Sequence, residues 1–263
     1  MRIFLHAFVL CVALTFLVGC GATKIDQDVS FKQEAGVALD SRYKIPPAQL
    51  LVFTKTNGFR HKSITKGVAT LRKLGLENNF GVVHTEDSLQ FNTETLKRYQ
   101  LVVFLNTTMD ILGDRQEAAF EDYINNGGSY MGIHAAADTE YEWPWYGKLA
   151  GAYFLSHPKQ QEARIEVVDG THASTKHLSD SWRHFDEWYN YKNINPDLNI
   201  VMKLDESSYE GGKNGDNHPI AWYHEFDGGR AFYTGLGHTD EAYDQPDFRQ
   251  HLLGGIEYCL GRK

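Results

Sequence analysis

A run of five apolar residues at positions 101–105 constrains the fold of this 263-residue chain most strongly. An apolar run without alternation is typical of a parallel strand that helices bury on both faces. Three more short apolar runs precede or follow it, at residues 50–53, 81–84 and 130–133. Helical periodicity lies between these runs, over residues 63–76 and 114–126. The alternation of strand and helix predicts an α/β fold with a doubly wound, mostly parallel central sheet.

The second half of the chain is less regular, yet it continues the same domain. Strand-like runs occur at residues 164–168 and 199–204, and a closing helix is predicted over residues 248–260. Residues 220–225 and 230–234 flank the turn Asp227-Gly228-Gly229, which is a β-hairpin signal. Because no internal repeat or linker interrupts this stretch, we expect one domain over residues 48–263.

The first twenty residues look like a targeting segment. Arg2 precedes an apolar stretch of signal-peptide length over residues 3–18. The stretch ends in Leu17-Val18-Gly19-Cys20, which resembles a bacterial lipobox. The resemblance implies a signal peptide at 1–19, a lipidated tether at 20–47, and export to the cell envelope. A lipid on Cys20 would attach the chain to a membrane, which is the expected partner. In a Gram-negative host this would be the outer membrane, on the side that faces the periplasm. The alternative is an uncleaved N-terminal anchor.

Histidine is unusually abundant relative to cysteine in this chain. The chain has 12 histidines and only 3 cysteines, which excludes a disulfide scaffold. Cys20 belongs to the export signal, and Cys259 lies in an apolar helical pattern that predicts a packing role. The formal charge of −8 argues against nucleic acid as a partner. Metal or acid–base chemistry would therefore depend on imidazole groups.

Three histidines follow three predicted strands. His61 comes after the first strand, His134 after the strand at 130–133, and His238 after the strand at 230–234. In an open α/β sheet, ligands bind beyond the carboxyl ends of the strands. We therefore expect these imidazoles to share one site, with Arg60 and Asn106 nearby as candidate substrate-binding residues.

The segment Gly132-Ile133-His134-Ala135-Ala136 predicts a tight turn after a strand. Hydrolases use such a turn to lift a nucleophile clear of the sheet, and here the lifted side chain is His134. The alternative is a turn rich in small residues that serves packing alone.

Four segments of the chain carry a family resemblance: Phe59–Ile64, Gly128–Ala136, His184–Tyr189 and Gly235–Thr239. In this order they are similar to signatures of ThuA-like, trehalose-utilisation proteins. The resemblance implies a flavodoxin-like, class I glutamine-amidotransferase-like three-layer sandwich and a role in carbohydrate metabolism, often beside enzymes that make keto-sugars. His134 stands where an amidotransferase would carry its nucleophilic cysteine, so we argue against glutaminase chemistry. His238-Thr239-Asp240 keeps the shape of the amidotransferase His-x-Glu pair.

Two chemistries remain open for the predicted catalytic residues His134, His238 and Asp240. His61, His134 and His238 could hold a divalent metal, which is the candidate cofactor. Alternatively the histidines could form a metal-free acid–base pair, with Asp240 orienting His238.

Glu187 and Trp188 are further candidates for binding the ligand. Aromatic residues crowd positions 141–154 and 182–191, which favours a sugar or keto-sugar ligand, although the same residues could cover a core. Two functions follow: a carbohydrate enzyme, as a hydrolase, lyase or isomerase, or a non-catalytic sugar-binding or complex-forming lipoprotein. The sequence predicts no oligomeric state.

Overall fold

Nine strands form one mixed sheet in the computed structural model, which describes residues 48–262. The order across the sheet is β2-β1-β3-β4-β11-β10-β9-β6-β7. Its first five strands run parallel to one another: β1 (Ala48–Phe53), β2 (Phe80–Thr85), β3 (Leu101–Leu105), β4 (Ser129–Ile133) and β11 (Gly229–Thr234). Every residue of β3 and β4 is buried, as continuous apolar runs in a two-sided sheet require.

The other four strands of the sheet are antiparallel: β10 (His218–Phe226), β9 (Asn199–Asp205), β6 (Gln161–Val167) and β7 (Ser181–Asp186). The connection between β10 and β11 is a two-residue turn at Asp227-Gly228, and both residues have positive φ (47° and 91°). That conformation matches the twist of a hairpin and suits Asp-Gly. The predicted hairpin is confirmed, and it reverses the strand direction in the middle of the sheet.

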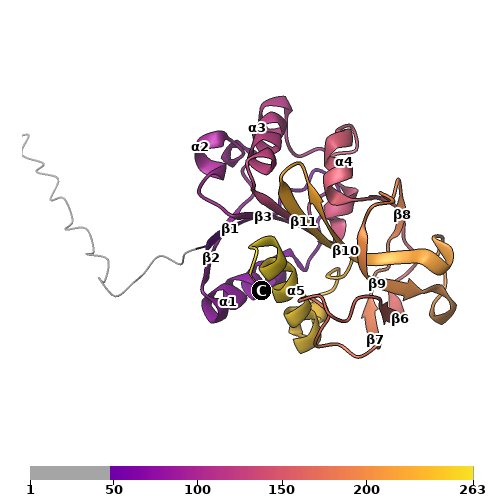
Figure 1. Cartoon of the computed structure of the whole chain (residues 1–263). Coiled ribbons are helices and arrows are strands. Elements are labelled where there is room, and N and C mark those ends of the chain that lie inside the picture. The colour runs from indigo at the N-terminus through magenta and orange to yellow at the C-terminus, as the bar shows by residue number, and fades with distance from the viewer. Residues whose placement is uncertain (1–47, 263) are drawn as a thin grey trace, which may run out of the picture. The chain divides into compact units, whose positions relative to one another are not determined.

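Helices cover both faces of the parallel half (Figure 1). One face carries α1 (Ile64–Asn78) and α5 (Pro246–Cys259), and the other carries α2 (Thr93–Leu96), α3 (Asp114–Asn125) and α4 (Pro144–Ala150). A separate two-stranded sheet pairs β5 (Tyr153–Ser156) with β8 (Asn190–Lys192). Short 3-10 helices complete the described elements: η1 (Ser88–Gln90), η2 (His134–Asp138), η3 (Glu206–Ser208), η4 (Gly215–Asn217) and η5 (Glu241–Asp244).

The predicted α/β class with a layered, flavodoxin-like sheet is confirmed. The sequence pattern does not predict three of the elements: α4, β5 and β8. They come from the two aromatic-rich stretches, neither of which has a clear period. Cys259 is buried in α5 with its Sγ 3.3 Å from the carbonyl oxygen of Tyr130, and burial raises the pKa of its thiol. The thiol therefore has the environment of a packing residue.

The predicted targeting segment lies outside the described residues. The signal peptide at 1–19, the tether at 20–47 and the lipid on Cys20 thus stay predictions. Within residues 48–262, no helix combines the length and apolarity that crossing a bilayer requires.

A buried carboxylate braces the connection that follows β3. Glu140 is 2% exposed, and its Oε1 accepts hydrogen bonds from the backbone N–H groups of Ile111 (3.0 Å) and Leu112 (2.8 Å). Burial raises the pKa of Glu140 from 4.5 to about 7, although the two N–H donors oppose the shift. Between these two pH values the folded state binds more protons than the unfolded state, so stability falls as pH rises through this window.

We expect Glu140→Gln to remove this pH dependence, because glutamine keeps an acceptor oxygen and does not titrate. The variant should match the native protein near pH 5 and exceed its unfolding free energy by about 2 kcal/mol at pH 8. Urea unfolding at both pH values measures the difference. Glu142→Gln, two residues away on the surface, is the matched control. An unchanged pH profile in Glu140→Gln would contradict the assignment.

Candidate metal centre

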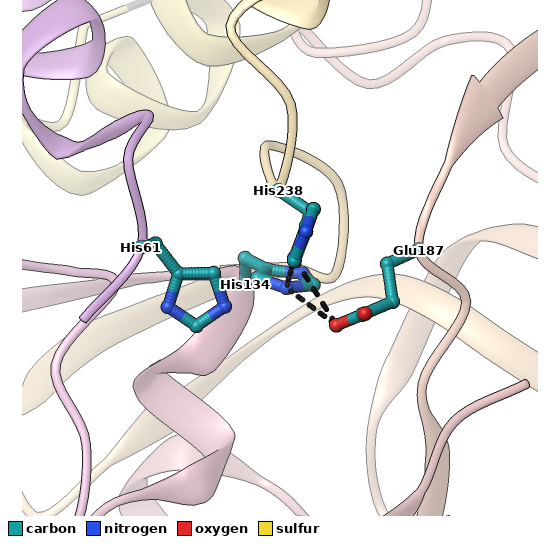
Figure 2. A group of neighbouring side chains, drawn as sticks. All are labelled: His61, His134, Glu187 and His238. Atoms are coloured by element: carbon teal, nitrogen blue, oxygen red, sulfur yellow. Dashed lines mark hydrogen bonds and ion pairs between the residues drawn. The ribbon is translucent and has the colours of Figure 1, made fainter. Parts of the chain in front are cut away.

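Four side chains from distant parts of the chain meet at the carboxyl edge of the sheet (Figure 2). His61 lies between β1 and α1, His134 directly follows β4, Glu187 directly follows β7, and His238 follows β11. One ligand atom from each of them lies within 4.8 Å of those of the others. We call these four residues the histidine cluster.

Three donor atoms of the histidine cluster have the spacing of metal ligands. His134 Nε2 lies 3.1 Å from His238 Nδ1 and 3.5 Å from Glu187 Oε2, and His238 Nδ1 lies 3.1 Å from the same oxygen. A tetrahedral ion with bonds of about 2.0–2.1 Å separates its ligand atoms by about 3.3 Å. The three atoms therefore surround a position where such an ion would fit.

The backbone and hydrogen bonds of His134 direct its free nitrogen into the cluster. The residue has φ of 49°, in the left-handed region that a side chain with a Cβ rarely adopts. Its Nδ1 lies 2.8 Å from the carbonyl oxygen of Gly235, which can only accept, so Nδ1 carries the proton. The lone pair of Nε2 then faces His238 and Glu187. The ring of Tyr189 packs against the imidazole with a centroid distance of 4.3 Å.

Glu187 supplies the carboxylate of the cluster. Its side chain is 8% exposed, and Oε1 lies 3.1 Å from His157 Nδ1 while Oε2 faces His134 and His238. Burial opposes ionisation, but contact with His134 and His238 outweighs it and holds the pKa of Glu187 below its ordinary value. The group is an anion at neutral pH and suits a cation beside it.

A second buried acid, Asp186, fixes the loop that carries His238. It accepts hydrogen bonds from the backbone N–H groups of Gly237 (2.7 Å) and His238 (3.1 Å). The Nε2 of His238 lies 2.7 Å from the side-chain nitrogen of Gln160. If His238 Nδ1 binds an ion, Nε2 carries the proton, and the Gln160 amide must present its oxygen instead.

His61 completes the cluster from the opposite side. Its ring is edge-on to those of His134 and His238, with centroid distances of 5.0 and 4.9 Å. Burial, followed by the charges of the two neighbouring histidines, lowers the pKa of His61 to about 2, so the imidazole is neutral. Its buried Nδ1 has no hydrogen-bond partner among the described residues. Four histidines outside the cluster share that property, so the spacing of donors is the stronger observation.

The structure places the other candidate residues outside direct contact with the cluster. Arg60 forms an exposed ion pair with Glu86. Asn106 is fully buried and ties Ser63 to the carbonyl of Gly237. Trp188 is fully buried, and its indole N–H donates to Gln161, so it presents no ring face to a ligand. Asp240 is exposed, and no side-chain contact with His238 occurs among the described residues. The backbone of His238 is instead held by Asp186.

Three residues of the site were not identified from the sequence: Gln160, Asp186 and Tyr189. Asp186 and Tyr189 belong to the motif His184–Tyr189, which already pointed to this region. Gln160 lies in the connection between β5 and β6, and no local pattern shows that this connection reaches the cluster.

Comparisons with known proteins identify a family through a family model and show the same fold in solved structures. A family model described as ThuA, trehalose utilisation, matches residues 49–259. No curated protein matches the chain. The structure of a ThuA-like protein from Bacteroides uniformis ATCC 8492 superposes with a TM-score of 0.71 at 24% identity, over 82% of this chain and 93% of that chain. A ThuA-like protein from Parabacteroides merdae ATCC 43184 gives 0.68 at 23%, over 82% and 91%. A β-galactosidase from Bacillus circulans sp. alkalophilus gives 0.55 at 12%, over 82% and 31%.

Proposed function

The chain belongs to the ThuA, trehalose-utilisation family, and from this premise we propose that it acts on a sugar or keto-sugar through a divalent metal. The metal would be held by the histidine cluster. The observation that carries the proposal is the convergence of His134 Nε2, His238 Nδ1 and Glu187 Oε2 at 3.1–3.5 Å. The carbohydrate part rests on the family description and stands as a proposal for this chain.

The donor set narrows the choice of metal. Imidazole nitrogens with one carboxylate suit zinc and the late first-row transition metals, whereas magnesium and calcium prefer oxygen ligands alone. His134, Glu187 and His238 form the tight triad, and His61 lies near enough to join it as a fourth ligand. With three protein ligands the ion would keep the open position that catalytic zinc sites use for water or substrate, and with His61 also bound it would take one by expanding to five ligands.

A bound metal would polarise a sugar carbonyl or lower the pKa of a water molecule. Around it, Gly235 fixes the tautomer of His134, Asp186 fixes the loop of His238, and His157 contacts the outer oxygen of Glu187. The His157 side chain is 43% exposed, so it connects this oxygen of Glu187 to solvent. Cysteine glutaminase chemistry has no nucleophile among residues 48–262, since His134 occupies the turn and Cys259 is buried in the core.

Metal analysis of the purified chain tests the proposal. We expect about one equivalent of a divalent transition metal per chain, lost on chelation and restored by zinc, cobalt or nickel. His61→Ala should weaken the affinity. His224→Ala is its matched control, because His224 is equally buried and also has an unpartnered nitrogen, but lies outside the cluster.

The result contradicts the proposal if none of the three metals binds the folded chain. Binding and turnover of a panel of glycosides and keto-glycosides are then measured with metal-loaded and metal-stripped protein. These measurements separate the two function classes. Metal-dependent turnover identifies an enzyme, whereas binding without turnover identifies a carbohydrate-binding protein.

A further inference from the structure

A groove of about 420 Å³ opens beside the histidine cluster. Its lining includes one cluster member, His238, together with Phe59, Lys62, Gln160, Asp240 and Glu241. The volume lies within the range of small-molecule sites. We call it the Phe59 groove.

Phe59 exposes an unusual amount of aromatic surface at this place. Its side chain is 64% exposed, although a ring of this size is normally buried. It is nevertheless held in position: its carbonyl accepts a hydrogen bond from Thr108 Oγ1 (3.1 Å), and its ring meets His61 edge-on at 4.9 Å. The backbone at Phe59 is thus held in place, and the exposed ring contacts His61, a member of the histidine cluster.

The polar groups of the groove are available to a ligand. Lys62, Asp240 and Glu241 are exposed, and none forms an ion pair with another described residue. Carboxylates can accept two hydrogen bonds from neighbouring hydroxyls, and an ammonium group can donate to a hydroxyl oxygen. An apolar ring face beside such groups complements a sugar, which has an apolar C–H face and a polar rim of hydroxyls.

We propose that the Phe59 groove binds a neutral glycosyl unit that is joined to the sugar at the histidine cluster. This inference rests on the proposed function and adds that the substrate is a glycoside of at least two units. The charges favour a neutral ligand, because two carboxylates and one ammonium leave a net negative groove that disfavours a phosphorylated or uronic acid unit.

Gln160 connects the groove to the cluster. Its amide lines the groove and also contacts His238 Nε2 at 2.7 Å. A glycosyl unit bound over Phe59 therefore meets the group that orients His238. The Gln160 side chain therefore links ligand binding in the Phe59 groove to the orientation of His238 in the histidine cluster.

Calorimetric titration of the metal-loaded full chain with maltose, cellobiose, glucose and a disaccharide phosphate tests the inference. We expect a disaccharide to bind more tightly than glucose and more tightly than the phosphate. Phe59→Ala should weaken disaccharide binding about tenfold or more, and Phe59→Trp should preserve it. Leu89→Ala, which removes an apolar side chain that is 69% exposed outside the groove, is the control and should have no effect.

The inference is overturned if neither disaccharide binds at about 20 mM, or if Phe59→Ala binds like the native chain. A preference for the phosphate would equally exclude a neutral unit. Metal affinity, measured on the same variants, separates this inference from the proposed function. If a variant loses disaccharide binding but still binds metal, the inference about the groove is tested separately and the metal centre is unaffected. If the native chain binds no metal, the proposed function itself is wrong.

Discussion

His134→Asn is expected to lose at least about 100-fold in metal affinity while the domain still folds. Asparagine adopts the left-handed backbone conformation more readily than most residues, so φ near 49° is retained. Its amide can still donate toward the carbonyl of Gly235. It cannot place a nitrogen lone pair at the position of Nε2, which lies 3.1 Å from His238 Nδ1. The variant therefore removes a ligand without imposing new backbone strain.

Competition with a chromophoric chelator measures the affinity, and circular dichroism checks the fold. His224→Asn provides the control, because it makes the same replacement at a buried histidine outside the histidine cluster. A folded His134→Asn that binds metal as tightly as the native chain would remove His134 from the ligand set.

Asp186→Ala should reduce the unfolding free energy by about 3–5 kcal/mol. The carboxylate is fully buried and accepts from the N–H groups of Gly237 and His238. Burial raises its pKa, but His184 and these contacts outweigh that effect and leave the pKa lowered. Without it, the backbone N–H groups of Glu187, Gly237 and His238 lose their acceptor, and His184 loses a neighbour. For a domain of this size the melting temperature should fall by roughly 6–20 °C.

Thermal and urea unfolding provide the measurement. Asp240→Ala is the control: this acid follows the same loop but is exposed, so we expect a change within about 0.5 kcal/mol. Metal affinity should fall about 10- to 100-fold in Asp186→Ala, since the loop that presents His238 is released. Equal stability of the two variants would show that Asp186 does not brace the site.

The sequence predicted the parallel half of the sheet well because each strand there is a local apolar run. It also indicated His61, His134 and His238, since a residue that follows a parallel strand is placed at one edge by the fold itself. Glu187 was singled out, but its position beside His134 and His238 depends on where the edge strand β7 pairs in the antiparallel half. That pairing is set by long-range packing, which a local pattern does not encode.

Some candidate residues lie outside the histidine cluster for the same physical reason. Trp188 was considered for its residue type, and the fold uses its ring as buried volume. Arg60 is next to His61 in sequence, but adjacent side chains point in different directions, and it pairs with Glu86. Asp240 is predicted to orient His238 because it lies two residues after it, as in the amidotransferase His-x-Glu pair, whereas the contact with the His238 backbone comes from Asp186 at the end of β7.

The wide separation of the cluster along the chain has a consequence for biogenesis. His61 and His238 are 177 positions apart (238 − 61), and Glu187 comes from an edge strand at the far end of the sheet. A chain that is still being synthesised, or still threading through an export channel in an unfolded form, does not possess the site. The proposed metal could therefore bind only after nearly the whole domain has folded, so the compartment where folding finishes, and its metal content, would determine which ion the protein carries.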